Sequence, residues 1–131
     1  MKVLIVEDDF ASRVLLQGLL QSLGVCHTAA NGKEAVFAFE TAVNSGEPYD
    51  LICLDIMMPE MDGQIALKEL RHIEDKAGIL ASDGVKVVMM TALDDKDNVM
   101  QAFREQCDAY IVKPIQREKV METLSSLGMI Q

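Results

Sequence analysis

LICLDIMMP, residues 51–59, is an apolar strand that ends in a single carboxylate, Asp55, before a short loop. An isolated carboxylate at the end of a buried strand is costly to desolvate. We therefore expect Asp55 to be paired, metal-bound or reactive. Two further apolar strands also run into ionisable groups, one at Glu7-Asp8-Asp9 and one at Lys113.

On both sides of this stretch, apolar runs of four to six residues alternate with longer segments whose apolar residues have the period of a helix. This is the pattern of βα units around a parallel sheet, and we count five units. The strands are expected near residues 2–6, 25–29, 51–54, 85–90 and 109–112. The sequence therefore predicts one α/β domain over residues 1–131.

The first helix is expected over residues 10–23, with Gly24 as its stop. Its apolar residues with the spacing of one inward-facing stripe are Val14, Leu15, Leu19 and Leu23. Asn31 with Glu34 three residues later resembles a capping box for the second helix. That helix is expected to end at Asn44-Ser45-Gly46.

The third helix is expected to follow Gly63 and to decay into a polar connection, residues 74–84, before the fourth strand. We predict that this long connection is an ordinary surface loop, because such loops tolerate insertion, and a docking role stays open. Asp94 and Asp97 are expected to open the fourth helix, where negative charge suits the helix dipole. Its inward-facing residues are expected to be Val99, Met100 and Phe103. A fifth helix is expected over about residues 117–128.

The chain carries a net charge of -9 and has a pI near 4.6. This charge works against binding of a nucleic-acid backbone, which needs a clustered basic patch, and favours a cationic partner or a divalent cation. The apolar runs are far shorter than the roughly 18 residues that a membrane span needs, so we expect no membrane insertion. Cys26, Cys53 and Cys107 are an odd number without C-x-x-C spacing, which predicts reduced thiols in the cytoplasm.

In an open parallel sheet, ligands bind beyond the carboxyl ends of the strands. The ionisable and hydroxyl side chains of this sequence stand at those ends. Glu7 and Asp8 follow the first strand, Asp55 the third, Thr91 the fourth and Lys113 the fifth. We expect these five residues to converge on one edge of the sheet.

These elements, in this order at strand ends, resemble the receiver domain of two-component response regulators. The similarity covers about residues 2–127 and is carried by VEDD (6–9), LDIMMP (54–59) with Gly63, MTA (90–92) and YIVKP (110–114). It implies a flavodoxin-like fold, with a doubly wound five-stranded parallel sheet in the order 2-1-3-4-5 and five helices. It also implies a cytoplasmic phosphoprotein that acts in phosphorelay signalling and is not a turnover enzyme.

The resemblance implies that Asp55 accepts a phosphoryl group from a phosphohistidine of a sensor histidine kinase or histidine phosphotransfer protein. It further implies a Mg²⁺ site, with Mn²⁺ as an alternative. The ligands implied are Asp8, Asp55 and the backbone carbonyl of Met57, with Glu7 acting through water. Oxygen donors of this kind, few of them carboxylates, fit Mg²⁺ better than Ca²⁺.

The resemblance also assigns the other strand ends. Lys113 is expected to pair with Asp55 before transfer and with the phosphoryl oxygens afterwards, while the Thr91 hydroxyl donates to another of those oxygens. Tyr110 is expected to rotate inward behind Thr91, and the bond before Pro114 is expected to be cis. The fourth helix, fifth strand and fifth helix then present a changed surface to a downstream partner.

Two positions near Asp55 depart from the best-known chemotaxis pattern. Met57, two residues after Asp55, and Leu93, two residues after Thr91, are apolar. Polar side chains there help to orient an attacking water, whereas methionine and leucine crowd it out. We therefore predict slow loss of the phosphoryl group.

The sequence also allows other interpretations of these residues. Alone, Glu7-Asp8-Asp9 reads as an acidic turn that caps the first helix, and we assign Asp9 to that cap. His27 and His72 lack metal-binding neighbours and are expected at the surface. A Mg²⁺-dependent phosphohydrolase with an aspartyl nucleophile needs a proton donor where Met57 stands. A flavodoxin-like electron carrier needs a phosphate loop after the first strand that this sequence lacks.

Overall fold

Five parallel strands form one sheet in the computed structural model of the chain, which describes residues 1–58, 61–92, 100 and 107–131. The strands are β1 (Lys2–Val6), β2 (Val25–Ala29), β3 (Leu51–Asp55), β4 (Lys86–Thr91) and β5 (Ala109–Val112). Their order in the sheet is β2-β1-β3-β4-β5, as predicted. The order reverses between β1 and β3, and in open α/β sheets ligands bind at the carboxyl ends of the strands where the order reverses.

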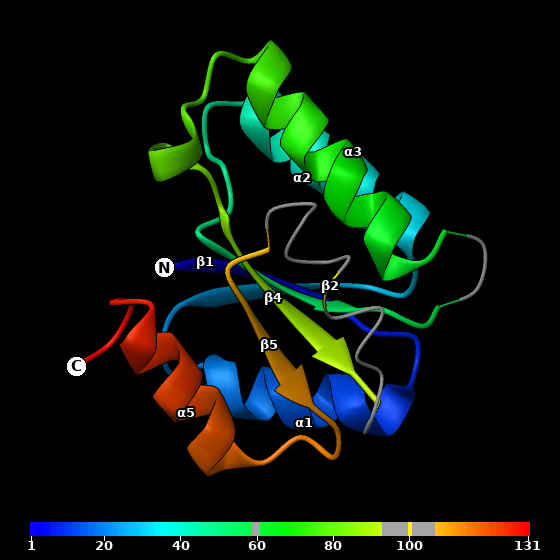
Figure 1. The fold of residues 1–131 in the computed structure, drawn as a ribbon, viewed down its shortest axis with the longest axis vertical. Helices are drawn as coiled ribbons and strands as arrows, with labels where there is room; N and C mark the ends of the chain where they lie inside the picture. Colours follow the sequence, from blue (N-terminus) through cyan, green and yellow to red (C-terminus); the bar gives the residue numbers. More distant parts are fainter. Residues whose placement is uncertain (59–60, 93–99, 101–106) are drawn as a thin grey trace.

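Helices cover both faces of the sheet (Figure 1). On one face lie α1 (Phe10–Leu20) and α5 (Arg117–Ser126), and on the other lie α2 (Gly32–Asn44) and α3 (Gly63–Lys76). None of the helices that the structure describes is long and apolar enough to cross a membrane. The predicted fourth helix, with Asp94, Asp97, Val99 and Phe103, falls outside the described residues.

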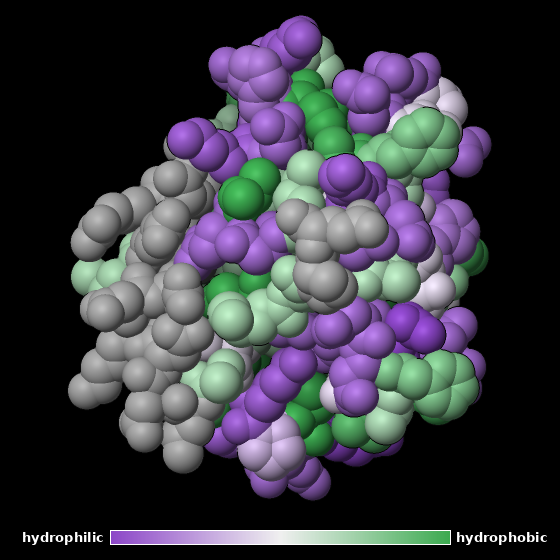
Figure 2. Space-filling model, turned by 90° about the vertical axis from the view of Figure 1, so that its right-hand side faces the viewer, coloured by the Kyte–Doolittle hydropathy of each residue, from purple (hydrophilic) through white to green (hydrophobic). Residues whose placement is uncertain are grey.

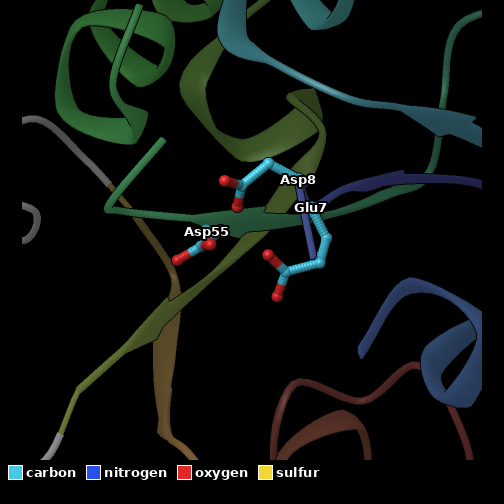
Figure 3. Close-up of side chains that lie close together, drawn as sticks. All are labelled: Glu7, Asp8 and Asp55. Atoms are coloured by element: carbon cyan, nitrogen blue, oxygen red, sulfur yellow. The ribbon is translucent and has the colours of Figure 1, made fainter. Parts of the chain in front are cut away.

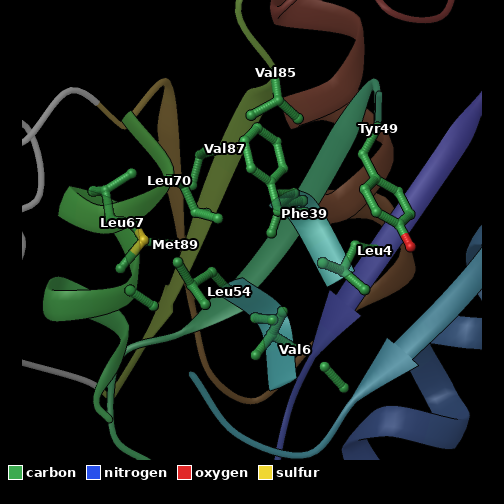
Figure 4. Close-up of a cluster of buried hydrophobic side chains, with 14 of the residues drawn as sticks. Leu4, Val6, Phe39, Tyr49, Leu54, Leu67, Leu70, Val85, Val87 and Met89 are labelled. Carbon is green, nitrogen blue, oxygen red and sulfur yellow. The ribbon is translucent and has the colours of Figure 1, made fainter. Parts of the chain in front are cut away.

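The sheet separates two clusters of buried side chains, one under each pair of helices. Along β1, Leu4 and Val6 join the cluster under α2 and α3, whereas Val3 and Ile5 join the cluster under α1 and α5. This alternation follows from the period of two residues in a strand. Figure 4 shows the first cluster, with Phe39 of α2 among residues from the central strands. All five residues of β3 are buried, as expected for a central parallel strand.

The inward stripe of α1 agrees with the prediction only in part, because Leu19 and Leu23 pack against the buried cluster as expected but Val14 and Leu15 do not. Leu16 and Leu20 are the buried residues of this helix, whereas Val14 and Leu15 are 50% and 45% exposed. Apolar residues of α1 also flank the buried positions on the helix surface. The spacing of apolar residues in the sequence therefore fits more than one face of the helix as the buried face. Met100 was also expected to face inward and is 57% exposed.

Gly24 has a different role from the one predicted. The helix before it ends at Leu20 and not at residue 23. A Cβ atom on Gly24 would lie 1.8 Å from the carbonyl oxygen of Met1. This glycine therefore allows the chain to pass close to the N-terminal strand, and it does not cap the helix.

Asn31 caps α2 as predicted, but the Glu34 carboxylate accepts from the amide of Ala30, one residue before the cap, in place of the Asn31 amide of a capping box. The Asn31 side chain accepts a hydrogen bond from the Glu34 amide at 2.9 Å, and the Glu34 carboxylate accepts one from the Ala30 amide at 3.2 Å. The helix ends at Asn44, and Gly46 follows with a φ of 78°, a conformation that favours glycine.

The connection of residues 74–84 is more ordered than a plain surface loop. It begins inside α3 and contains a short 3-10 helix, Ala81–Asp83. Glu74 is only 6% exposed, and its carboxylate accepts hydrogen bonds from the Val85 amide (2.6 Å) and from Arg71 (2.7 Å). Arg71 in turn contacts Asp108 at 3.0 Å. The buried Glu74 and the partly buried pair of Arg71 and Asp108 therefore link α3 to the starts of β4 and β5.

Candidate functional site

Three carboxylates meet where β1 and β3 end (Figure 3). Asp55 is the last residue of β3 and is 3% exposed, Glu7 follows β1 and is fully buried, and Asp8 is exposed. One oxygen from each of the three lies within 4.8 Å of the others. The predicted convergence of Glu7, Asp8 and Asp55 is therefore present in the structure.

Lys113, just after β5, bridges two of these carboxylates. Its Nζ lies 2.8 Å from an oxygen of Glu7 and 3.1 Å from an oxygen of Asp55. The pairing with Asp55 was expected, whereas the pairing with Glu7 was missed, because no spacing in the sequence shows which of two acidic residues a distant lysine reaches. Three strand ends are thus joined by one ammonium group.

Burial and mutual repulsion separate the proton affinities of the two buried carboxylates. Burial, followed by the interactions with Glu7, raises the pKa of Asp55 from 3.8 to about 7. Burial also opposes ionisation of Glu7, but its hydrogen bonds with Asp55 and Lys113 lower its pKa below the ordinary value. The same two carboxylates outweigh the effect of burial on Lys113 and raise its pKa. A single ammonium group therefore does not fully compensate the carboxylates here.

The donor set fits a small, hard cation. Glu7, Asp8 and Asp55 offer only oxygen atoms, and such ligands suit Mg²⁺ or Mn²⁺. Among the described residues, these three carboxylates are accompanied by one lysine, and burial, followed by the interactions with Glu7, raises the pKa of Asp55. An added divalent charge would stabilise the ionised form of Asp55 against both effects. We conclude that the residues present fit a Mg²⁺ ion.

Thr91 ends β4, the strand that pairs with β3 and places Met90 beside Asp55. It is the last residue of that strand, one position later than predicted, and is 2% exposed. Its hydroxyl donates to the Ala92 carbonyl at 3.3 Å, and its own carbonyl accepts a hydrogen bond from the Lys113 amide at 2.8 Å. The bond between Lys113 and Pro114 is cis, as expected.

The loop after Asp55 is held close to the strand end. The Met57 amide donates to an Asp55 oxygen at 3.3 Å, while the Met57 side chain is 65% exposed. A Cβ atom on Gly63 would lie 2.3 Å from the Asp55 carbonyl oxygen, so only glycine allows the start of α3 to approach this closely. Gly63 is one of the residues that carry the resemblance to receiver domains, but the sequence did not predict this packing role.

The remaining predicted residues lie around this centre. Tyr110 in β5 is 44% exposed, so in this structure its ring is turned toward solvent. Asp9 caps α1 through a 2.9 Å hydrogen bond from the Ser12 amide, which confirms the role assigned to it. His27 and His72 are exposed, as predicted. Leu93 lies outside the described residues.

The described surface at this end of the sheet is mostly polar. Figure 2 views the molecule from the side on which the loops after β1 and β3 lie, and polar residues predominate there, with smaller apolar areas between them. Among the exposed apolar residues near these strand ends are Phe10 and Met57.

The chain matches a family model described as the response regulator receiver domain over residues 3–125. It is 35% identical over 127 residues to the chemotaxis protein CheY of Listeria monocytogenes, with 95% of each chain covered. It is also 30% identical over 134 residues to probable histidine kinase 2 of rice (Oryza sativa), but spans only 12% of that protein.

Two solved structures show the same fold. One is the complex of CheX with CheY, BeF3 and Mg²⁺ from Borrelia burgdorferi, with a TM-score of 0.81, 28% identity, and 100% of this chain and 90% of that chain covered. The other is the complex of the Saccharomyces cerevisiae histidine phosphotransfer protein Ypd1 with the receiver domain of Ssk1. Its TM-score is 0.82 at 26% identity, with 98% of this chain and 88% of that chain covered.

Proposed function

The chain belongs to the response regulator receiver domain family, and from this premise we propose that Asp55 is its phosphoryl acceptor. Receiver domains are signalling modules of two-component systems, and this is the function of the chain. The observation that supports the acceptor assignment is the position of the Asp55 carboxylate. The carboxylate belongs to a residue that is only 3% exposed, lies close to the carboxylates of Glu7 and Asp8, and is 3.1 Å from the Lys113 ammonium.

In the proposed reaction, an ionised Asp55 oxygen attacks the phosphorus of a phosphohistidine. A bond from this oxygen to phosphorus forms while the bond from phosphorus to the histidine nitrogen breaks, and the electron pair stays on the nitrogen. A Mg²⁺ ion held by Glu7, Asp8 and Asp55 would supply positive charge between the two anions. We include the Met57 carbonyl among its ligands from the family resemblance.

Lys113 and Thr91 would receive the transferred group. The Lys113 ammonium already lies 3.1 Å from Asp55 and would turn to the phosphoryl oxygens, while the Thr91 hydroxyl would leave the Ala92 carbonyl to donate to another. Inward rotation of Tyr110, now 44% exposed, would follow Thr91. These movements would change the surface that β5, α5 and the predicted fourth helix present to a downstream protein.

We propose a histidine kinase or a histidine phosphotransfer protein as the donor, in the cytoplasm. The similarity to a receiver domain crystallised with a phosphotransfer protein supports this class of partner. A net charge of -9 argues against nucleic acid as a partner of this domain. The chemistry would occur once for each signal and not as turnover, because the position two residues after Asp55 holds the thioether of Met57 and no proton donor.

The test is intact-mass measurement after incubation with acetyl phosphate, with and without Mg²⁺. We expect one phosphoryl adduct on the parent that needs Mg²⁺, and none on Asp55→Asn. Adduct formation without Mg²⁺, or undiminished in the variant, would contradict the mechanism. Steady phosphate release from small phosphomonoesters would instead indicate a phosphohydrolase.

Met57 and Leu93 predict that the phosphorylated protein is long-lived. The Met57→Asn variant places a polar side chain beside the acceptor, where it is able to orient water, and we expect loss of the phosphoryl group to accelerate by roughly three- to tenfold. This is below the roughly 100- to 10,000-fold of general acid–base catalysis, because an amide orients the water but takes no proton from it. The decay of the adduct mass after removal of the donor measures this rate. The Met57→Leu variant is the matched control and should decay like the parent. Fast decay of the parent, unchanged in Met57→Asn, would show that the side chain at this position does not control hydrolysis.

A further inference from the structure

Arg13, in the first turns of α1, has no role in the chemistry described above. Its Nη1 donates a hydrogen bond of 2.9 Å to the backbone carbonyl of Glu7. Its guanidinium also lies 5.6 Å from the centre of the Phe10 ring. The side chain is half-buried and spans the turn from α1 back to the end of β1.

This contact fixes the peptide that joins two of the acidic residues. The Glu7 amide donates to the Ala29 carbonyl of β2 at 3.1 Å, and the Glu7 carbonyl accepts from Arg13. Because a peptide unit is planar, holding the carbonyl also sets the direction of the Asp8 amide and the position of the Asp8 Cα atom. Arg13 therefore restrains the backbone that carries the side chains of Glu7 and Asp8.

An arginine suits this position for physical reasons. Its guanidinium remains charged at all relevant pH values, so its hydrogen bond to a carbonyl is stronger than one between neutral groups. The guanidinium also lies over the Phe10 ring, within the distance of a cation–π contact, which favours this placement of the Arg13 side chain. A lysine in its place would keep the charge but would lose the planar fork.

We propose that Arg13 is a positioning residue for the cation site, and that it acts through the Glu7–Asp8 peptide. The proposal rests on the proposed function, since it assumes that Glu7 and Asp8 hold a divalent cation. A positioning role and simple electrostatics predict opposite changes in cation affinity when Arg13 is replaced by a neutral residue. Removal of a positive charge near three carboxylates should strengthen cation binding by Coulomb attraction alone, whereas loss of a positioning contact should weaken it.

The test is the dissociation constant for Mn²⁺, measured by electron paramagnetic resonance on the full chain, and for Mg²⁺ by calorimetry. We expect Arg13→Met, which keeps an apolar stem but removes the charge and donors, to weaken binding by about three- to tenfold. This lies below the 10–100-fold usual for groups that directly orient a metal ligand, because Arg13 acts through the backbone. Arg13→Lys should recover part of the loss. Lys33→Met removes an exposed positive charge from the first turn of α2 and should leave binding unchanged or slightly tighter.

Unchanged or tighter binding in Arg13→Met would overturn the positioning role, and so would an equal loss of affinity in Lys33→Met. If the parent binds neither cation, the proposed function fails and the role of Arg13 fails with it; if the parent binds and Arg13→Met matches it, only the role of Arg13 fails. Far-UV circular dichroism checks that each variant is folded. Should Arg13→Met not fold, Arg13→Gln is judged by the same criterion.

Discussion

The Asp55→Asn variant is expected to be more stable than the parent at pH 8 without divalent cations, by about 2 kcal/mol in the free energy of unfolding. The pKa of Asp55 rises from 3.8 to about 7 on folding, mainly because the carboxylate is buried. Each tenfold change in proton affinity corresponds to about 1.4 kcal/mol, so the upper limit of the cost of ionisation is about 4 kcal/mol. We expect about half of this limit, because the amide loses the charge-assisted contacts that Lys113 and the Met57 amide make with Asp55.

The sign of the pH dependence follows from the direction of that pKa change. Between about pH 4 and pH 7 the folded state holds a proton on Asp55 more tightly than the unfolded state does. The Asp55 contribution to stability therefore falls as pH rises through this window, and its full cost is present above about pH 7. Asparagine does not titrate, so the advantage of the variant should be smaller at pH 5 than at pH 8.

Urea unfolding followed by circular dichroism at both pH values measures this difference. Asp75→Asn, which removes an exposed carboxylate from α3, is the matched control and should change stability little. Millimolar Mg²⁺ should stabilise the parent more than the Asp55→Asn variant, because a ligand stabilises the folded state that binds it. A variant less stable than the parent at pH 8, or an advantage that does not depend on pH, would contradict this account of Asp55.

The Glu74→Ala variant is expected to lose about 3 kcal/mol of stability. Its carboxylate is 6% exposed and accepts hydrogen bonds from the Val85 amide and Arg71, so truncation leaves a buried amide and a partly buried guanidinium with fewer partners. Removal of one partner from a buried ion pair typically costs about 3–5 kcal/mol. We expect the lower end, because Arg71 keeps its contacts with Asp108 and the Val85 carbonyl.

Two further variants separate charge from hydrogen bonding at this position. Glu74→Gln keeps an acceptor for the Val85 amide and should lose about 1–2 kcal/mol, the usual cost of weakening a buried hydrogen bond. Glu69→Ala removes an exposed carboxylate from the same helix and should be nearly neutral. Urea unfolding measures all three, and hydrogen exchange of the Val85 amide should speed up in Glu74→Ala. Equal stability of the Glu69 and Glu74 alanine variants would show that the buried network contributes nothing.

The strands and the acidic site were predictable because both depend on local signals. Apolar runs marked every strand to within one residue, and a polar or charged residue at the end of a run placed Asp55 and Thr91 at the correct edge of the sheet. The order of the strands came from the family resemblance. The inward direction of α1 was not predictable, because Val14 and Leu15 are as apolar as Leu16 and Leu20, which the sheet buries instead.

Long-range polar contacts were the other part that the sequence did not reveal. Glu74 reads as part of a polar loop, and only the approach of Val85 and Asp108 in three dimensions explains its burial. Its spacing of three from Arg71 on a helix was the one available signal. The contact of Arg13 with the Glu7 carbonyl could not be predicted from a single sequence. Every residue has a backbone carbonyl, so the residue type at position 7 does not indicate that its carbonyl accepts this hydrogen bond.

The bridge from Lys113 to Glu7 and Asp55 has a consequence for biosynthesis. It joins residues that are 58 and more positions apart, so the bridge exists only after the first and last strands have paired with the middle of the sheet. A ribosome-bound chain that has not yet released its last strand lacks the lysine, and contacts of such long sequence separation form late in folding. We expect nascent and partly folded copies to be poor substrates for a phosphodonor, so that only fully assembled molecules carry a signal.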